Sequence, residues 1–138
     1  MDFLPLFHNL KCRRVMVIGG GEIALRKVRL VAEADAFITI VAKEYCADLI
    51  EMRDTNAKKG IHNLELITAP YEQKYIENNP EAVLVIAATN DPELNREVSK
   101  HAQQAHMLSN VVDDPGYSTV IFPSIVDRSP IQIAISSG

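Results

Sequence analysis

The sequence predicts an α/β fold, a Rossmann-like doubly wound parallel sheet followed by a C-terminal β-hairpin. Up to Pro115, short apolar segments alternate with segments whose apolar residues recur at helical spacing. That alternation is typical of βαβ units, whose strands are parallel. After Pro115, two apolar segments follow each other with no helix between them, which is typical of a hairpin. We therefore expect residues 1–115 to form one domain and residues 116–138 to begin a separate dimerisation segment.

Each element has a signal of its own. Apolar runs predict strands over residues 15–18, 37–41, 64–68, 82–88 and 107–112. The run AVLVIAA at 82–88 is continuous, as expected of a strand that is buried on both faces. Helices are expected over 22–34 and 47–57. A third should start at Pro92, behind the N-cap Asp91. The hairpin is expected over 119–126 and 131–136, joined by residues 127–130.

The first expected strand runs into the turn GGGEIA at residues 19–24, a G-x-G-x-x-A pattern. Between a strand and a helix, this pattern is typical of a dinucleotide site. Gly19 allows the tight turn, Gly21 lets a pyrophosphate approach the backbone, and Ala24 lets the helix pack close to the strand. The helix N-terminus offers N–H groups and partial positive charge to the phosphates. The expected cofactor-binding residues of this turn are Gly19, Gly20, Gly21, Glu22 and Ile23.

The acidic residue that usually binds a ribose in such sites is missing. It should end the second strand, and that position is Ala42, followed by Lys43. The lysine is compatible with the 2′-phosphate of NADP⁺, whereas backbone groups at Ala42 and Lys43 are compatible with the ribose of NAD⁺. These residues by themselves leave the choice of cofactor open.

Composition and charge exclude several classes of function. The net charge is −4, so no global basic field attracts nucleic acid. No apolar run is long enough to span a membrane, and the N-terminal residues do not follow the order of a signal peptide, so we expect a cytoplasmic protein. The four histidines show no metal-ligand spacing, and Cys12 and Cys46 lack a CxxC partner. No permanent metal site is expected.

Several segments resemble those of one family. They are LPLF at 4–7, VIGGGEIALRK at 17–27, IAATND at 86–91, NVVDDP at 110–115, FPSIVDRSP at 122–130 and IAISSG at 133–138. In this order, across nearly the whole chain, they are similar to the N-terminal module of siroheme synthase, the precorrin-2 dehydrogenase and sirohydrochlorin ferrochelatase family. The last two segments are more specific than the glycine turn, which many unrelated folds share.

The resemblance implies an enzyme of siroheme biosynthesis. In that family, precorrin-2 loses a hydride to NAD⁺ and a proton to a base, giving sirohydrochlorin. Some members then insert ferrous iron, so Fe²⁺ is an additional expected substrate. Members use NAD⁺ without a strict acid after the second strand, which favours NAD⁺ here. They form homodimers through interlocking C-terminal segments, which would cover the apolar edge of the hairpin. They also continue into a helical segment, so we expect the natural chain to extend past residue 138.

Residues after the fourth and fifth strands are further candidates for the site. Asp113 matches the family's functional aspartate and follows a parallel strand, where ligands are usually bound. It is expected to accept the proton from the substrate, and Asp114 is the neighbour with which it could be confused. Thr89, Asn90 and Asp91 are expected beside the ribose or nicotinamide of the cofactor, although Asp91 equally fits a helix cap.

A substrate rich in carboxylates needs a locally positive or donor-rich site in a protein of net negative charge. Arg128 is a candidate because guanidinium binds carboxylates well, and its alternative role is a salt bridge with Asp127. The expected substrate-binding residues are Asn110, Ser124, Arg128 and Ser137.

The alternative function is a nucleotide-sensing regulatory module without catalysis, like those of potassium-transport systems. Those modules are also single Rossmann domains of similar length. They usually keep the acid after the second strand and lack a DRSP hairpin.

Overall fold

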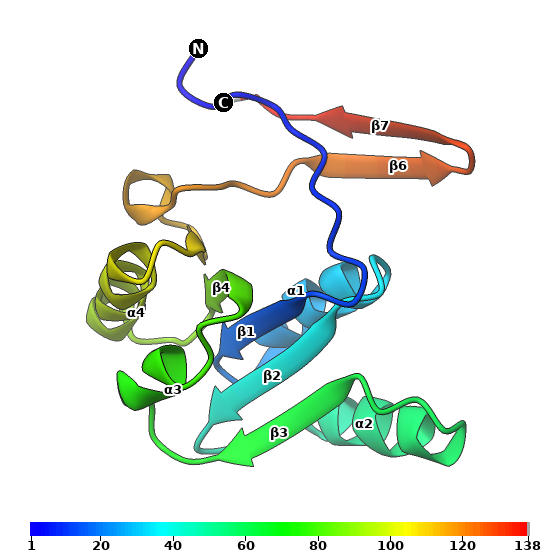
Figure 1. Cartoon of the computed structure of the whole chain (residues 1–138), viewed down its shortest axis with the longest axis vertical. Coiled ribbons are helices and arrows are strands. Elements are labelled where there is room, and N and C mark those ends of the chain that lie inside the picture. Colours follow the sequence, from blue (N-terminus) through cyan, green and yellow to red (C-terminus); the bar gives the residue numbers. More distant parts are fainter. Residues whose placement is uncertain (138) are drawn as a thin grey trace.

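The structure, a computed structural model, describes residues 1–137 and contains a five-stranded parallel sheet (Figure 1). Its strands lie in the order β3-β2-β1-β4-β5, and each neighbouring pair is parallel. The bounds are β1 (Arg14–Ile18), β2 (Phe37–Ala42), β3 (Leu64–Thr68), β4 (Ala82–Ala87) and β5 (Leu108–Val111). The strand order reverses between β1 and β4, so the doubly wound sheet predicted from the sequence is confirmed.

Helices cover both faces of the sheet. α1 (Glu22–Ala32) and α2 (Ala47–Lys58) share one core cluster with β1, β2 and β4, whereas α3 (Lys74–Glu77) and α4 (Pro92–Gln104) pack on the other face. The helical spacing that predicts α1 is confirmed, because Ala24, Val28 and Val31 are all buried. These two apolar layers fix the sheet between the helices and hold its loops in place.

The start of α4 also follows its prediction. Asp91 Oδ1 accepts hydrogen bonds from the backbone N–H groups of Glu93, at 3.1 Å, and Leu94, at 3.3 Å. Pro92, which has no N–H to satisfy, is the first residue of the helix. The helix therefore begins directly outside the end of β4.

Other helix bounds differ from the predicted ones. α1 ends at Ala32 rather than at residue 34, because the chain turns at Asp35, whose φ is +58°. The sequence pattern does not predict the single turn of α3 or the 3₁₀ turn η1 (Pro115–Tyr117). Segments this short contain too few apolar repeats to show a period.

The chain ends in an antiparallel hairpin of β6 (Ser124–Arg128) and β7 (Ile131–Ile135). The predicted first arm, 119–126, is corrected: the strand starts only at Ser124. The N–H groups of Thr119 and Val120 instead donate to the carbonyl oxygen of Ser109, at 2.8 and 3.1 Å. This stretch is therefore tied to the outer edge of β5.

The predicted connection of the hairpin, 127–130, is also shorter than expected. Asp127 and Arg128 belong to β6 and pair with Gln132 and Ile131, which leaves only Ser129 and Pro130 between the strands. β6 and β7 form a sheet of their own, separate from the five-stranded sheet (Figure 1).

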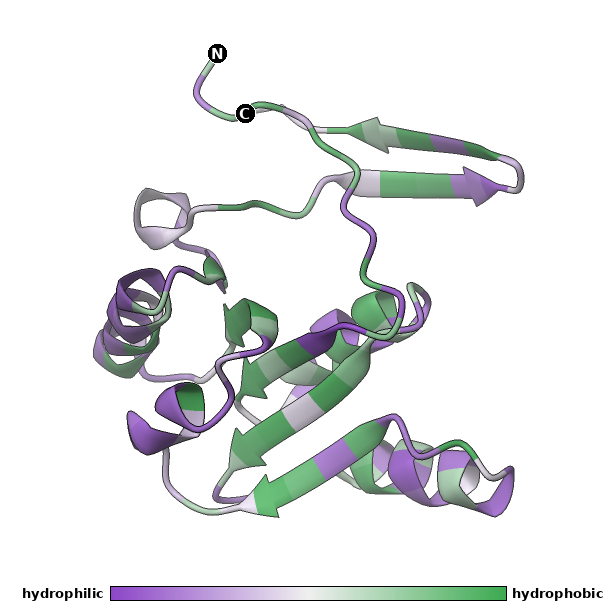
Figure 2. Cartoon of the chain, viewed as in Figure 1, coloured by the Kyte–Doolittle hydropathy of each residue, from purple (hydrophilic) through white to green (hydrophobic). Residues whose placement is uncertain are grey.

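The hairpin presents apolar side chains to solvent. Ile131, Ile133 and Ile135 are 64%, 50% and 63% exposed, and Figure 2 shows hydrophobic residues along both strands. The apolar N-terminal segment, which runs toward the hairpin in Figure 1, exposes Leu6 and Phe7 in the same way. No helix within residues 1–137 has both the length and the apolar character that crossing a membrane requires.

Candidate functional site

The carboxyl ends of the parallel strands meet at one edge of the sheet, which we call the carboxyl edge. The glycine turn follows β1, residues 43–46 follow β2, residues 88–91 follow β4 and residues 112–114 follow β5. In doubly wound sheets, ligands bind outside this edge at the point where the strand order reverses. That point lies between β1 and β4, and most of the predicted cofactor residues lie on these four connections.

Gly19 and Gly20 allow the glycine turn to pack against neighbouring loops. Gly19 has a φ of +126°, and a Cβ there would collide with the carbonyl group of Ala88. A Cβ on Gly20 would collide with the carbonyl oxygen of Glu44 and lie 2.9 Å from Cβ of Ala42. Both glycines are therefore required by the protein's own packing, and a direct role of Gly20 in cofactor binding stays a prediction.

Gly21 has different surroundings, since a Cβ there would meet nothing within 4 Å. Gly21 is the N-cap of α1 and makes no side-chain cap, so the N–H groups of the first turn have no partner within the helix. The exposed residues Glu22 and Ile23 form this turn. Open space, free N–H groups and the positive end of the helix dipole together fit a dinucleotide pyrophosphate.

The loop after β2 is fastened to the glycine turn and to β3. The N–H of Cys46 donates to the carbonyl oxygen of Gly20 at 2.7 Å. The Tyr45 hydroxyl lies 2.9 Å from the carbonyl oxygen of Ile40 and 2.5 Å from that of Ile67. Burial raises the pKa of Tyr45 to about 12, so its hydroxyl stays protonated and can donate. No sequence motif identifies this tyrosine, because its two acceptors are backbone carbonyls of separate strands, β2 and β3.

The two residues proposed to meet the cofactor ribose lie at the start of this loop. Ala42 is half-buried at the end of β2, with its Cβ against Gly20, whereas Lys43 is exposed. The side chain at position 42 thus takes part in packing the turn. Lys43 is free to reach a ligand at the carboxyl edge.

The loop after β4 is held by Asn95, a buried residue of α4 that the sequence analysis missed. Asn95 Oδ1 accepts hydrogen bonds from Thr89, from N–H at 3.1 Å and from the hydroxyl at 2.6 Å, and Asn95 Nδ2 donates to the Thr89 carbonyl at 3.0 Å. Asn90 is exposed, and its side chain makes no hydrogen bond within residues 1–137. Of the three predicted residues, Thr89 and Asp91 hold the loop, and Asn90 has a free side chain.

Asp113 and Asp114 have different environments. Asp113 is exposed, with a left-handed φ of +58°, and its carboxylate makes no hydrogen bond or ion pair within the described part of the chain. Asp114 is half-buried, and its Oδ2 accepts a hydrogen bond from Nε of Arg96 at 3.0 Å. The guanidinium of Arg96 also lies 4.6 Å from the ring centroid of Tyr117. Asp114 therefore anchors the loop, and Asp113 is the carboxylate that remains available.

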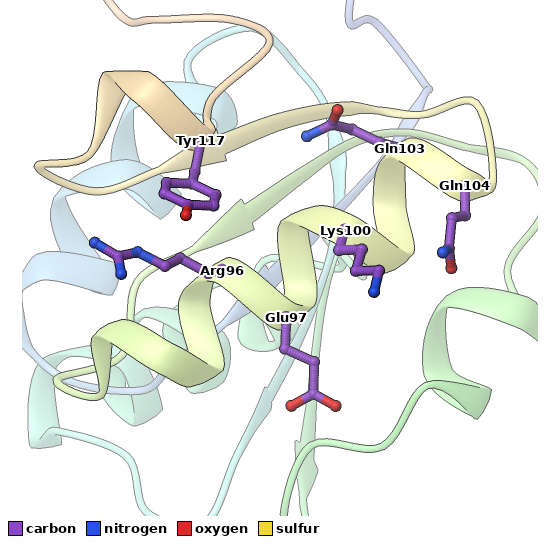
Figure 3. Close-up of a pocket in the computed structure, with 6 residues that line it drawn as sticks. All are labelled: Arg96, Glu97, Lys100, Gln103, Gln104 and Tyr117. Atoms are coloured by element: carbon purple, nitrogen blue, oxygen red, sulfur yellow. The ribbon is translucent and has the colours of Figure 1, made fainter.

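Arg96 and Tyr117 also border an open groove of about 740 Å³ on the outer side of α4. Figure 3 shows the guanidinium of Arg96 beside the ring of Tyr117, with Lys100 farther along the helix. The groove contains none of the predicted site residues. Because Arg96, which borders the groove, binds Asp114, this side of α4 supports the Asp113 loop.

Two serine hydroxyls also hold the backbone around the Asp113 loop. Ser118 Oγ accepts from the Val111 N–H at 2.8 Å and donates to the Asp114 carbonyl at 3.0 Å. Ser99 Oγ donates to the Tyr117 carbonyl at 2.6 Å. Backbone contacts of this kind leave no pattern in the sequence, which is why the sequence analysis did not identify them.

Asn110 lies in β5, three positions before Asp113, and is 5% exposed. Its Nδ2 donates to the Val120 carbonyl at 3.0 Å, but its Oδ1 has no partner within the described residues. A buried carbonyl oxygen without a donor costs about 1–3 kcal/mol. It is an acceptor that a ligand donor could satisfy.

The remaining predicted substrate residues, Ser124, Arg128 and Ser137, are exposed and lie on or next to the hairpin. The Arg128 guanidinium donates to the backbone carbonyl of Asp127 at 2.9 Å and forms no ion pair with its carboxylate. No hydrogen bond or ion pair in residues 1–137 joins these three side chains to Asp113. A role of these three residues in substrate binding stays a prediction.

Curated relatives match the whole chain. Siroheme synthase of Pseudomonas entomophila (strain L48) is 49% identical over 138 residues, and that of Stutzerimonas stutzeri (strain A1501) is 47% identical over the same length. The chain covers 28% of each of these relatives. The resemblance predicted from the sequence motifs is confirmed.

Solved structures and family models agree with this result. SirC, precorrin-2 dehydrogenase, superposes with a TM-score of 0.74 at 26% identity, over 98% of this chain and 62% of that one. The family described as "Putative NAD(P)-binding" matches residues 6–124, which include the glycine turn, Asp113 and the loop that braces it. On the match over most of its length, the chain belongs to this NAD(P)-binding family.

Proposed function

We propose that this chain oxidises precorrin-2 to sirohydrochlorin with NAD⁺, as a step of siroheme synthesis. One observation carries the proposal: an exposed carboxylate without a partner, Asp113, follows β5 at the same edge of the sheet as the open glycine turn. The names of the similar proteins, siroheme synthase and precorrin-2 dehydrogenase, supply the substrate.

In this proposal the chain's own residues bind, orient and accept a proton. The N–H groups that follow Gly21 bind the pyrophosphate, and the loop held by Asn95 presents Asn90 to the nicotinamide half. NAD⁺, when bound, supplies the acceptor for the hydride. Asp113 accepts the proton that the substrate loses. The contact of Arg96 with Asp114 keeps the loop that carries Asp113 in position.

The proposal is tested by mixing the 138-residue chain with precorrin-2 and either NAD⁺ or NADP⁺, and by following absorbance of the reduced nicotinamide and of sirohydrochlorin. We expect turnover with NAD⁺ and weaker binding of NADP⁺. Tighter binding of NADP⁺ would show that Lys43 recognises a 2′-phosphate. Nucleotide binding without any turnover would favour the regulatory alternative.

We also propose ferrous iron insertion as a second activity of the same site, because Asp113 offers free carboxylate oxygens beside the bound macrocycle. Sirohydrochlorin incubated with Fe²⁺ and the chain should form siroheme faster than a control without protein. Equal rates would restrict the chain to the dehydrogenase step.

A further inference from the structure

Lys27 lies beside the candidate site but has no role in the proposal above. It belongs to α1, where it is half-buried, and its ammonium lies 4.6 Å from the ring centroid of Phe122. Phe122 packs against the core cluster that contains Leu25 and Val28 of the same helix. Lys27 is therefore enclosed between α1 and the segment that leads from β5 to the hairpin.

The Lys27 ammonium has no fixed counterion. It makes no hydrogen bond or ion pair with any residue in 1–137, whereas the other half-buried basic side chains do: Arg14 lies 2.9 Å from Glu81, and Arg53 lies 2.9 Å from Asp54. Burial lowers the pKa of Lys27, and the charge of Asp113 partly opposes that effect. The Phe122 ring contacts this cation but carries no net charge, so a half-buried ammonium without an anionic partner remains costly, and an arriving anion would offset that cost.

The position of Lys27 indicates which anion it could bind. It comes five residues after Glu22, which is about 8 Å along the helix axis from the expected pyrophosphate position. Its electrostatic neighbour is Asp113, and its packing neighbour Phe122 belongs to the strip 120–122 that also accepts a hydrogen bond from Asn110. The ammonium thus lies on the Asp113 side of the site rather than on the phosphate side.

We propose that Lys27 binds a carboxylate of the tetrapyrrole and so positions the macrocycle next to Asp113. This inference rests on the proposed function, because that function supplies a substrate rich in carboxylates. The strip 120–122 thus contacts two groups from other elements: the Lys27 ammonium of α1, through Phe122, and Asn110 of β5, whose buried Oδ1 has no partner within the described residues. That pair matches a ligand that carries carboxylates around a ring of N–H donors.

The test compares three variants of the full 138-residue chain. Lys27→Met removes the charge and keeps the length, Lys27→Arg keeps the charge, and Arg26→Met removes the adjacent exposed cation of the same helix. Sirohydrochlorin, the product, is titrated into each by absorbance, and NAD⁺ is titrated separately. Thermal unfolding shows that each variant is folded.

We expect Lys27→Met to weaken sirohydrochlorin binding by about 10- to 100-fold and to raise the KM for precorrin-2 by a similar factor. Its kcat and its Kd for NAD⁺ should change by less than about twofold, because the ammonium touches neither phosphate nor the reacting atoms. Lys27→Arg should recover most of the affinity, and Arg26→Met should resemble the wild type.

Sirohydrochlorin binding of Lys27→Met within about twofold of the wild type overturns the inference, as does an equal loss in Arg26→Met. A fall in kcat at unchanged KM also overturns it, because Lys27 would then act on the reaction and not on binding. If the wild type binds sirohydrochlorin but does not oxidise precorrin-2, the proposed function fails, while the binding comparison still decides the role of Lys27. A wild type that does not bind sirohydrochlorin overturns both.

Discussion

Gly20 and Gly21 are neighbours, yet the structure gives them opposite surroundings. A side chain on Gly20 would collide with the loop after β2, whereas one on Gly21 would enter open space. The same residue type thus serves the protein's own packing at one position and leaves room in front of the backbone at the next. Substitutions at the two glycines should therefore affect different properties.

Gly21→Val should leave the fold intact and weaken NAD⁺ binding by about 100-fold, because the branched side chain fills the space expected for the phosphates. Gly20→Ala should instead destabilise the protein by about 1–3 kcal/mol, through overpacking against Glu44. Calorimetric titration of NAD⁺ and denaturant unfolding separate the two effects. Wild-type affinity in Gly21→Val would remove the turn from the cofactor site.

Asp113 and Asp114 allow a second test at the scale of single residues. Asp113→Asn keeps the shape and the tolerance of a left-handed φ but removes the base, so the precorrin-2 oxidation rate should fall by about 10²–10⁴. NAD⁺ affinity should hardly change, because the glycine turn is a separate element. The measurement is a steady-state rate for each variant beside the wild type.

Asp114→Asn serves as the matched control for Asp113→Asn. Its carboxylate is already engaged by Arg96, so the variant should lower stability slightly and the rate only mildly. If Asp114→Asn is the inactive variant and Asp113→Asn is active, the roles of the two aspartates are reversed. Activity in both variants would show that the proton goes to another group or to water.

At the scale of elements, Tyr45 connects the loop after β2 to the sheet and should make stability depend on alkaline pH. Burial raises its pKa from 10.0 to about 12, so the folded state retains the hydroxyl proton in a range where the unfolded chain loses it. The contribution of Tyr45 to the free energy of unfolding is therefore fully present below pH 10 and is lost between pH 10 and about 12. Tyr45→Phe should be less stable at neutral pH and should lose less stability over that range.

Denaturant unfolding at several alkaline pH values tests this expectation. Burial also raises the pKa of Tyr71, which remains in the variant. Part of the slope of unfolding free energy against pH is therefore kept. The informative quantity is therefore the difference in slope between Tyr45→Phe and the wild type. Identical slopes would mean that the loop opens before Tyr45 ionises.

The elements also show for which segments a sequence pattern is enough to predict the secondary structure. The long, regular segments were predictable, because burial on one face of α1 or on both faces of β4 imposes a period that the residues must follow. The stretch 119–123 was not, since its apolar residues resemble a strand. The N–H groups of Thr119 and Val120 instead donate to the carbonyl oxygen of Ser109, which lies about ten residues earlier in the chain. Local composition cannot specify a partner of this kind.

The candidate site likewise has one part that the sequence predicts and another that only the structure shows. The glycine turn and the position of Asp113 follow from a strand that ends in a turn, which is a local property. The contacts that hold them, from Asn95, Arg96 and Ser118, are side-chain bonds to backbone or to a neighbouring loop. The contacts of Asn95 and Arg96 depend on the packing of α4, and that of Ser118 depends on the turn η1, so they become visible only in three dimensions.

For the whole molecule, the exposed hairpin predicts a homodimer. Isolated two-stranded hairpins are marginally stable in water, and three exposed isoleucines on β7 would be covered by a second copy. A symmetric pair is the commonest closed arrangement. Light scattering at micromolar concentration should therefore give twice the chain mass of 15.3 kDa.

Two substitutions on β7 make this test specific. Ile133→Glu places a charge on the apolar side of the strand and should shift the protein to monomers, whereas Gln132→Glu changes the opposite side and should leave dimers intact. A wild type that stays monomeric over the same range would mean that the hairpin needs no second copy.

The left-handed backbone of Asp113 has a consequence for how this position can change in evolution. Glutamate is chemically the nearest replacement for an aspartate base, yet a longer side chain in this conformation costs about 1–2 kcal/mol, which aspartate and asparagine largely avoid. Among replacements that keep the size of the side chain, asparagine is the one that this backbone accepts most readily, and it removes the carboxylate. An isosteric substitution at this position would thus keep the fold while removing the proton acceptor that we propose for Asp113, so the proposed activity can be lost in evolution without loss of the fold.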